Sequence, residues 1–583
     1  MLEVKSRSGP ARAVRWSDGQ VRFDTPIVVL SDPKSQGTDI CELMLASANG
    51  VTQVAHKASG KTVFSIPESM FPPLSTLRWA GDMLPAVGAN SFAVTADTRM
   101  PEAEALKGKE FAILGNAFEM RRDARAFAKA VVELRKAVGN KRLIYSPGMM
   151  DVSNLALLAY MGVDVMDDSL VRYLASIGKV STTEGPVDSE EASWLFHDDA
   201  SKDVLAASEM NIWKEMQLVR HMIKKDSLRG LVETRVHSSP WMVAALRIFD
   251  EEQYGFQEER FPVIGTKFYA NSKQSLFRPD VLRHRKRILE RYSKPEHKRI
   301  LLLLPCSAKK PYYTSRSHQI FRRVLQSVTN FDIVHEVIVT SPLGVVPREL
   351  ELFYPAAQYD IPVTGHWDRE EVAMVQELVK HIAGQGYDRI ICHLGDEGEI
   401  VKQVIDCIDT SNGSPGSRDS LNALRAVLSE ECSKQPRVPI GVDRQRTLAA
   451  VSRFQFGPEA GVLTEGCRVS GSYPYARIQL TPQSQMGMLT PERGMISLTV
   501  EGAERIYGKG LGWVKIGEFD IEGNLFAKGV SEADPNIRVG DEVAVVRSGK
   551  VVGVGVAMMF GSEMTDSDRG EAVRMRHYVK LKK

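Results

Sequence analysis

The alternation of short apolar runs with amphipathic stretches along the first half of the chain constrains the fold most strongly. Apolar runs at residues 27–30, 111–114 and 142–145 have the length and composition of buried parallel strands. Between the last two runs, apolar side chains recur at spacings of three and four over residues 118–138, which predicts a helix. Repetition of this strand–helix unit favours a (β/α) barrel over residues 1–290.

A second α/β unit is predicted over residues 291–432. The basic stretch at residues 283–299 precedes it and is typical of a boundary helix followed by a linker. Residues 300–304 form a continuous apolar run that Pro305 ends, as expected for a strand buried on both faces. Because helices and apolar runs alternate after it, we expect three layers, with helices on both faces of a mostly parallel sheet. The predicted helices cover residues 315–325, 371–382 and 420–430, and the predicted strands cover residues 333–340 and 389–394.

The pattern changes again toward the C-terminus. Residues 433–507 mix helical and strand-like segments, so we predict a small α+β domain there. Over residues 508–583, short β runs alternate with Gly and Asp turns, which predicts an all-β module. A chain of 583 residues is too long for one hydrophobic core, and this α/β multidomain division accommodates its length.

Composition excludes several classes of protein. Lys and Arg (75) nearly balance Asp and Glu (73), so any nucleic-acid-binding surface must be local. The 6 cysteines are scattered without a CxxC pair, which argues against a structural zinc site and against a secreted disulfide scaffold. The N-terminus has no apolar signal region, and no apolar run is long enough to span a bilayer. We therefore predict a cytoplasmic protein without a bound metal and without membrane contact.

The strongest chemical signal lies in residues 305–318, where the buried strand ends and a helix is expected to begin. Ligands bind at this edge of open α/β sheets. Cys306 would lie near a helix N-terminus beside Lys309 and Lys310, and both effects would lower the pKa of its thiol from about 8.5. The helix dipole would also keep His318 neutral and able to act as a base.

A purely structural interpretation of the same segment stays open. Cys306 would then be a small buried hydrophobe. Ser315 would act only as an N-cap, and Pro311 would only shape the turn.

Two further loops belong to the same sheet edge if the strands are placed correctly. Ser341 and Gly344 follow one predicted strand, and Asp396 follows another. Ordinary turn chemistry is the alternative explanation for both loops. Because these loops and residues 305–318 would face one crevice, we nevertheless favour a catalytic site there. The predicted catalytic groups are Cys306, Lys310, His318 and Asp396, and the predicted substrate-binding residues are Pro305, Pro311, Tyr312, Ser315, Ser341 and Gly344.

The segment matches the motif PC-x3-KPY-x2-S-x2-H of the archaeosine synthases, and the whole chain resembles that family. The fixed positions are Pro305, Cys306, Lys310, Pro311, Tyr312, Ser315 and His318. The first half is similar to the barrel of tRNA-guanine transglycosylases through residues 162–168, in which Asp167 takes the place of the nucleophilic aspartate. The last module resembles a PUA domain, a type that binds tRNA, through residues 523–530 and 540–543.

The resemblance implies a tRNA-modifying transferase that needs no cofactor. The family modifies 7-cyano-7-deazaguanine that already stands at position 15 in the D-loop of tRNA, adding an amine to its nitrile toward archaeosine. The implied donor is lysine, with glutamine or ammonia as the alternatives, and the implied protein partner is a radical-SAM lyase. The oligomeric state stays open, with a homodimer as one alternative.

The residues of the motif suit this chemistry. A thiolate at Cys306 would add to the electrophilic nitrile carbon and form a thioimidate, which the amine then displaces. His318 or Asp396 would take the proton of the amine, and Lys310 would stabilise negative charge developing on nitrogen. Direct attack by the amine, with Cys306 only lining the pocket, is the alternative.

The basic C-terminal segment is the predicted RNA-binding surface. A final strand would present Arg574 and Arg576 on one face, with Lys580 close behind, and contacts to phosphates would position the tRNA. The alternative is a solvated C-terminal tail that does not bind RNA.

Two rival functions follow from other parts of the chain. One is base exchange by a transglycosylase through Asp167, although the CxCxxC zinc cluster of those enzymes is missing from this sequence. The other is a non-catalytic tRNA-binding protein that uses residues 283–299 and the PUA-like module. The motif at residues 305–318 counts against it, because binding alone needs no cysteine at a strand end.

Overall fold

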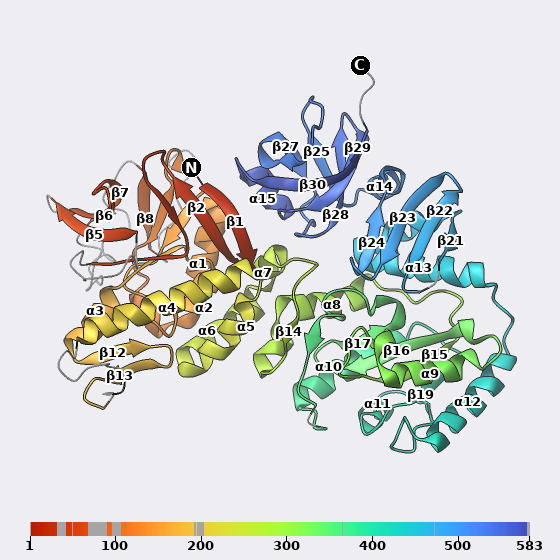
Figure 1. Cartoon of the computed structure of the whole chain (residues 1–583). Coiled ribbons are helices and arrows are strands. Elements are labelled where there is room, and N and C mark those ends of the chain that lie inside the picture. Colours follow the sequence, from red (N-terminus) through yellow and green to blue (C-terminus); the bar gives the residue numbers. More distant parts are fainter. Residues whose placement is uncertain are drawn as a thin grey trace. The chain divides into compact units, whose positions relative to one another are not determined.

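The computed structural model of the chain describes two compact units. The described residues are 2–31, 42–48, 51–67, 90–95, 106–191, 194, 203–363, 365–471 and 473–579. Residues 1–261 and 566–570 form the first unit, and residues 262–565 and 571–583 form the second (Figure 1). Within the described ranges, no helix combines the length and the hydropathy that a membrane span requires.

The first unit is built on a parallel sheet of five strands in the order β4-β11-β10-β9-β8. These strands are β4 (Ile27–Val29), β8 (Ser91–Val94), β9 (Phe111–Leu114), β10 (Leu143–Tyr145) and β11 (Val165–Asp167). The helix expected over residues 118–138 begins later, as α1 (Ala124–Val138), because Asp123 caps it by accepting a hydrogen bond from the Ala126 N–H. The sheet corresponds to half of a (β/α) barrel, so the described residues confirm the parallel α/β architecture without showing a closed ring.

Antiparallel strands and a set of helices complete the first unit. The strand order is β1-β2-β3 in one small sheet and β5-β6-β7 in another, and β12 pairs with β13. The strands are β1 (Leu2–Ser8), β2 (Ala11–Ser17), β3 (Arg22–Asp24), β5 (Leu43–Ala48), β6 (Val51–His56), β7 (Thr62–Pro67), β12 (Lys179–Thr182) and β13 (Gly185–Asp188). The helices are α2 (Leu155–Met161), α3 (Ser169–Ser176), α4 (Val204–Lys224), α5 (Leu228–Arg235), α6 (Pro240–Glu252) and α7 (Tyr254–Arg260).

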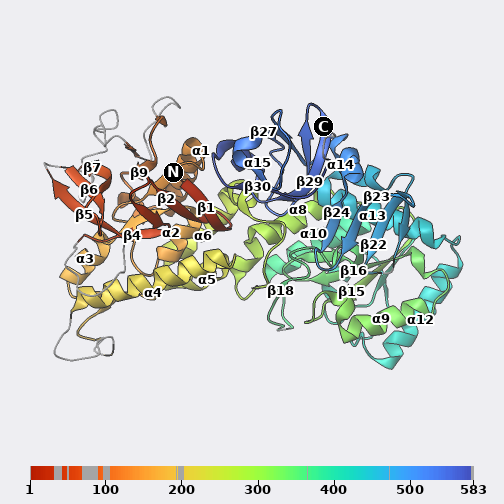
Figure 2. The ribbon, with the colours of Figure 1, turned by 45° about the horizontal axis from the view of Figure 1, so that its top comes forward.

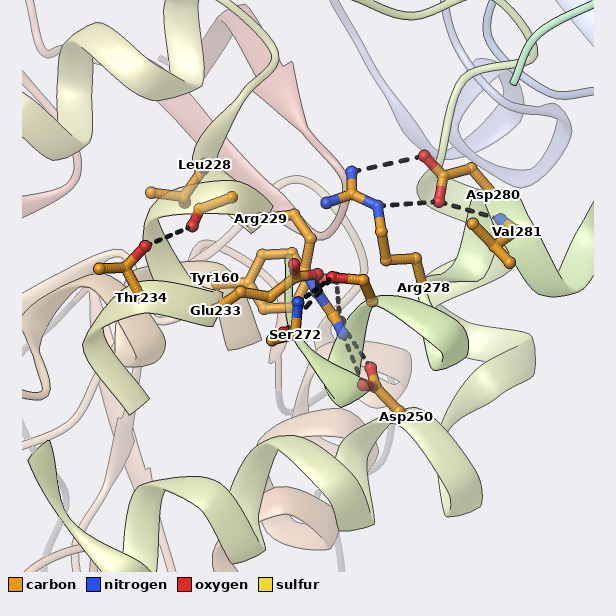
Figure 3. A network of polar contacts seen from close by, with 12 residues as sticks. Tyr160, Leu228, Arg229, Glu233, Thr234, Asp250, Ser272, Arg278, Asp280 and Val281 are labelled. Atoms are coloured by element: carbon orange, nitrogen blue, oxygen red, sulfur yellow. Dashed lines mark hydrogen bonds and ion pairs between the residues drawn. The ribbon is translucent and has the colours of Figure 1, made fainter. Parts of the chain in front are cut away.

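A buried charge cluster joins three of these helices. The Arg229 guanidinium of α5 donates two hydrogen bonds of 2.6 Å to the Asp250 carboxylate of α6, and a third of 2.9 Å to Glu233 (Figure 3). It also donates to the Tyr160 hydroxyl of α2 at 3.2 Å. The side chains of Arg229 and Asp250 are 2% and 1% exposed, so each charge depends on its partner for the hydrogen bonds that water would otherwise supply.

The second unit is centred on a sheet with the order β17-β16-β15-β19-β20. Its strands are β15 (Ile300–Pro305), β16 (Val334–Thr340), β17 (Gly344–Pro347), β19 (Arg389–Cys392) and β20 (Ile408–Asp409). Three neighbouring pairs are parallel, with Ile300 opposite both Val334 and Arg389, and only β17 runs antiparallel. The two-residue strands β14 (Phe268–Tyr269) and β18 (Tyr359–Asp360) pair separately in parallel.

Helices cover both faces of this sheet, as the apolar run at residues 300–304 predicts. The helices of this region are α8 (Pro279–Glu290), α9 (Arg316–Gln326), α10 (Arg369–Ala383), α11 (Gly398–Lys402) and α12 (Arg418–Ser433). Leu302 shares one cluster with Phe321 of α9 and Leu424 of α12, whereas Leu303 shares another with Ile288 of α8 and Leu378 of α10. Alternate side chains of β15 therefore point to opposite layers, and α9 and α12 lie side by side (Figure 2).

The helix expected at the start of residues 283–299 is confirmed as α8, but its basic side chains are not free. Arg283 and Arg285 belong to α8 in the second unit, and their guanidinium groups donate hydrogen bonds of 2.8 Å to the carbonyl oxygens of Pro262 and Pro342. His284 lies 3.0 Å from the carbonyl oxygen of Val345 and is buried. Charges that satisfy buried backbone groups are not available to bind RNA.

Two smaller sheets follow along the chain. The first, in the order β21-β22-β23-β24, is antiparallel, and the second has the order β26-β30-β29-β28-β25-β27. The elements are α13 (Ile440–Phe456), β21 (Arg468–Ser470), β22 (Ala476–Thr481), β23 (Ser484–Thr490), β24 (Met495–Leu498), α14 (Val500–Tyr507), β25 (Trp513–Ile516), β26 (Leu525–Phe526), β27 (Val530–Ala533), β28 (Glu542–Arg547), β29 (Lys550–Ala557), α15 (Gly561–Asp566) and β30 (Glu571–Tyr578). The division into domains at residues 290, 432 and 507 stays a prediction.

The buried cluster gives a stability prediction for the first unit. Asp250→Ala should lower the free energy of unfolding by about 3–5 kcal/mol, because it leaves the Arg229 guanidinium buried without its main partner. The matched control is Glu252→Ala on the same helix, whose side chain is 40% exposed and pairs with Arg125, and it should cost no more than about 1 kcal/mol. Urea unfolding of the full chain followed by circular dichroism measures both, and equal losses would contradict the assignment.

Candidate functional site

The motif lies where the central strand of the second unit ends. Strand β15 stops at Pro305, and Cys306 is the next residue. The chain then passes through the turn Tyr312–Thr314 before α9 begins at Arg316. Because β15, β16 and β19 are parallel, the residues after each of them lie at the same edge of the sheet.

Cys306 is half-buried beside a cationic and a hydroxylic side chain. It packs against the apolar cluster that contains Tyr312 and Tyr359. Burial raises the pKa of the Cys306 thiol above its usual 9.0, while the Lys310 ammonium and the Thr340 hydroxyl act in the opposite direction. The prediction of a lowered thiol pKa is therefore wrong, because loss of water outweighs the nearby cation and α9 begins ten positions later in the chain.

Lys310 shares the same environment. Its ammonium lies 4.0 Å above the centre of the Tyr359 ring, a cation–π contact. Burial lowers the pKa of Lys310, and its interaction with Cys306 acts in the opposite direction. Burial therefore opposes the charged form of each group, thiolate and ammonium, while their mutual attraction favours the charged pair.

A chain of three hydroxyl groups lies beneath these two residues. The Tyr312 and Tyr359 hydroxyls are 2.5 Å apart, and the Tyr359 hydroxyl is 2.5 Å from the Thr340 hydroxyl. Tyr312, Tyr359 and Thr340 are almost completely buried. Burial and the neighbouring Cys306 raise the pKa of both tyrosines, so these hydroxyls stay protonated and can donate hydrogen bonds.

The loop after β19 supplies two carboxylates. Glu397 contributes to the raised pKa of the Cys306 thiol. Asp396 is exposed, and its carbonyl oxygen accepts a hydrogen bond from the Glu399 N–H at the start of α11. The assignment of Asp396 as a proton acceptor stays a prediction.

His318 is buried away from solvent in the first turn of α9. Its Nδ1 accepts a hydrogen bond of 2.8 Å from Arg348, and its ring lies 5.3 Å from that of Tyr312. Burial, together with the Arg348 guanidinium, lowers the pKa of His318 from 6.5 to about 2. The expected neutral imidazole agrees with this direction, and the two causes are stronger than the helix dipole alone. The contact with Tyr312 connects His318 to the hydroxyl chain.

Ser315 is the N-cap of α9. Its hydroxyl accepts a hydrogen bond of 3.3 Å from the His318 N–H, and the residue is 3% exposed. Pro311 precedes the turn Tyr312–Thr314, and Pro305 is the last residue of β15. These contacts follow the structural interpretation of Ser315, whose part in binding substrate stays a prediction.

Ser341 and Gly344 follow β16 at the same edge. The Ser341 hydroxyl donates a hydrogen bond of 2.5 Å to Glu371 of α10. Gly344 has a φ of 78°, and a Cβ atom there would lie 2.2 Å from a methyl group of Leu378. Gly344 is therefore required by the left-handed backbone and by the close approach of α10.

Asp167 is buried and hydrogen-bonded within the first unit. It lies at the end of β11 in the first unit and is completely buried. Its carboxylate accepts hydrogen bonds from the Tyr145 hydroxyl at 3.0 Å, the Gly148 N–H at 2.8 Å and the Ser169 N–H at 2.9 Å. Burial raises the pKa of Asp167. These contacts make Asp167 a structural acid that organises the ends of β10 and β11.

The two arginines predicted to bind RNA differ in their surroundings. Arg574 is 58% exposed and pairs with Glu571 at 3.0 Å. Arg576 pairs with the buried Glu542 and donates to the Leu498 carbonyl oxygen at 3.0 Å. The register of β29 and β30 shifts between Val554 and Gly555, and the role of both arginines in binding RNA stays a prediction. Lys580 lies outside the described residues.

Sequence reasoning missed Thr340, Tyr359, Glu397 and Arg348. Thr340 and Glu397 adjoin the two loops that were identified, so their proximity was the available signal. Tyr359 lies in the polar connector after β17, and only the pairing of β18 with β14 places it under Lys310. Among the described residues, no group of three or more His, Cys, Asp and Glu side chains is arranged to hold a metal ion.

Two protein families match parts of the chain. A family of unknown function, DUF5591, matches residues 281–428, which include the whole motif. The PUA domain family matches residues 519–579, so the PUA prediction is confirmed.

Full-length relatives extend the comparison over the whole chain. The chain is 34% identical to the archaeosine synthase subunit alpha of Methanosarcina acetivorans, over 91% of this chain and 90% of that protein. It is 32% identical to the archaeosine synthase of Haloferax volcanii, over 99% of each. It is 25% identical to the tRNA-guanine(15) transglycosylase of Methanobrevibacter smithii, over 65% of this chain and 55% of that protein. The identity and coverage shared with the first two show that the chain belongs to the archaeosine synthase family.

Proposed function

We propose that this protein modifies tRNA toward archaeosine by adding an amine to the nitrile of 7-cyano-7-deazaguanine at position 15 of the D-loop. The observation that carries the proposal is the placement of Cys306 beside Lys310 at the end of β15, within the family motif. A nitrile carbon is an electrophile, and a thiol with an adjacent amine is suited to add to it.

The proposed reaction runs in two steps. The sulfur of Cys306 bonds to the nitrile carbon, its proton passes through Lys310 to the nitrile nitrogen, and a thioimidate forms. The donor amine then bonds to the same carbon, the C–S bond breaks, and a proton from the amine returns to the thiol. The sum is nitrile plus amine giving amidine, without an oxidant or a cofactor. Direct attack by the amine, with Cys306 lining the pocket, is the simpler alternative.

The surrounding groups support this chemistry in defined ways. The Lys310 ammonium, half-buried over the Tyr359 ring, would stabilise negative charge developing on the nitrile nitrogen. Glu397 raises the pKa of the thiol and is our candidate for accepting a proton from the amine. Lysine is the proposed donor, with glutamine or ammonia as alternatives, and a radical-SAM lyase acting on the product in the cytoplasm is the proposed partner.

The first test removes the nucleophile. Cys306→Ala should abolish formation of the amidine while leaving tRNA affinity nearly unchanged, because the thiol acts on the base and not on the backbone. The measurement is mass spectrometry of tRNA that carries the nitrile base, after incubation with isotope-labelled lysine. The matched control is Asp167→Asn, which should leave lysine addition largely intact. A complete loss in Asp167→Asn, together with near-normal activity in Cys306→Ala, would assign the chemistry to the transglycosylase-like unit.

The second test follows the protonation of the thiol. Because burial raises the pKa of Cys306 above its usual 9.0, the thiolate should be scarce at neutral pH and increase as the pH rises through that raised value. Lys310→Met should move the midpoint to still higher pH, because it removes the cation that favours the thiolate. The rate of alkylation of the Cys306 peptide by iodoacetamide, followed by mass spectrometry from about pH 7 to pH 10, measures this shift. Lys309→Met, at an exposed neighbour, is the control, and a midpoint below 8 in the wild type would refute the assignment.

The third test concerns the PUA domain. Arg574→Gln should weaken tRNA binding and lower the slope of log affinity against log salt by about 0.7–0.9, the effect of one lost phosphate contact. Arg576→Gln should instead lower the melting temperature, since it leaves Glu542 buried without one of its two arginine partners. Fluorescence anisotropy at several salt concentrations and thermal denaturation distinguish the two. A salt slope unchanged by Arg574→Gln would remove that residue from the RNA-binding surface.

A further inference from the structure

The second unit contains a cavity outside the Cys306 site. It has a volume of about 380 Å³ and is lined by α9, the turn Phe331–Ile333, α13 and the strands β21 to β23. An adjoining hollow of about 180 Å³ shares several of its wall residues, among them Arg322 and Tyr473, and extends to His318. The cavity is therefore large enough for one nucleotide and opens toward the helix that carries the end of the motif.

Two arginines line this cavity; Arg322 lies 5.6 Å from the centre of the Tyr473 ring, and Arg444 interacts electrostatically with Asp332. Arg322 on α9 and Arg444 on α13 make no hydrogen bond or ion pair within 4 Å in the part of the chain that the structure describes. The carboxylates of Asp443 and Glu349 also face the cavity but are engaged elsewhere. Asp443 bonds His297 at 2.7 Å, and Glu349 accepts from the Tyr292 hydroxyl at 2.6 Å.

The charge that these carboxylates carry is also partly compensated. Lys298 donates to Asp443 at 3.0 Å, and His335 lies 3.4 Å from Glu349. The two guanidinium groups are thus left to attract an anion from solution. Asp332, the remaining carboxylate of the wall, accepts no hydrogen bond at its side chain from described residues and can accept one from a ligand.

Aromatic rings at the cavity are exposed and held in place. Phe331 is 36% exposed, and Tyr475 is 46% exposed. The Tyr475 hydroxyl donates to Glu492 at 2.6 Å, and the Tyr473 hydroxyl donates to Glu351 at 2.6 Å, so both hydroxyls anchor their rings. Exposed, pre-positioned rings beside free guanidinium groups are the arrangement that binds unpaired bases by stacking and their phosphates by charge.

We propose that this cavity binds one unpaired nucleotide of an RNA, with its base stacked on Tyr475 and Phe331 and its phosphate held by Arg322 and Arg444. Asp332 accepts a hydrogen bond from the base or the ribose. The site is separate from the PUA domain, and its hollow extends to His318, so RNA held there lies next to residues 305–318. The inference rests on the proposed function only in taking tRNA as the RNA.

Fluorescence anisotropy with an unmodified, labelled tRNA transcript and the full-length protein tests this inference. Tyr475→Ala and Phe331→Ala should each weaken binding by about 5-fold or more, the effect of losing one stacked base. The double variant Arg322→Gln, Arg444→Gln should lower the slope of log affinity against log salt by about 0.7 or more. Tyr475→Phe should bind like the wild type, because it keeps the ring.

Control variants on β22, next to the cavity, distinguish binding in the cavity from a general loss of RNA affinity. Arg477 and Leu480 of β22 are exposed and do not line the cavity, so Arg477→Gln and Leu480→Ala should leave affinity and salt slope unchanged. Equal losses in cavity and control variants would overturn the inference, as would wild-type affinity in Tyr475→Ala and Phe331→Ala.

A pocket for the free amino acid is the competing outcome. In that case tRNA affinity would be unchanged in every cavity variant, while the lysine concentration needed for half-maximal modification would rise, and the nucleotide assignment would be wrong. The failure of the proposed function is distinguishable from both results, since it would appear as normal modification by Cys306→Ala while the cavity variants still bind tRNA weakly.

Discussion

Burial of β15 on both faces is the constraint on which the second unit depends. Its leucines alternate between a layer that contains α9 and α12 and a layer that contains α8 and α10, so residues 300–304 are buried. The strand therefore holds a fixed position in the sheet, and Pro305 ends it at the edge. Cys306 is the first residue after the strand. The residues that follow β16 and β19 lie at the same edge of the sheet, because these strands are parallel to β15.

The same burial determines the electrostatics of the site. With little water around Cys306 and Lys310, the uncharged form of each is favoured, and the buried tyrosine hydroxyls stay protonated. Such a site holds a thiol and a lysine side chain next to each other, with protonated hydroxyl groups close by.

The residues at the strand ends of the two α/β units, Asp167 and Cys306, differ in burial and hydrogen bonding. Asp167 is buried and accepts hydrogen bonds from three described donors, whereas Cys306 is partly exposed. Burial and hydrogen bonding thus distinguish two residues that occupy similar positions at strand ends. The same reasoning separates Arg576, which neutralises Glu542, from Arg574, which stays exposed.

The sequence by itself determined the order of strands and helices, the edge at which the motif lies, and the PUA domain, because these depend on local apolar periodicity and on closely spaced motif residues. The start of α9 was expected from its capping residue Ser315, whereas the start of α1 after Asp123 was not. Only the tertiary structure decided that burial raises the thiol pKa, that Glu397 contributes to this rise, and that Lys310 lies over the Tyr359 ring. Each of these depends on segments far apart in the chain, and on how much water their packing leaves, which neither spacing nor composition specifies.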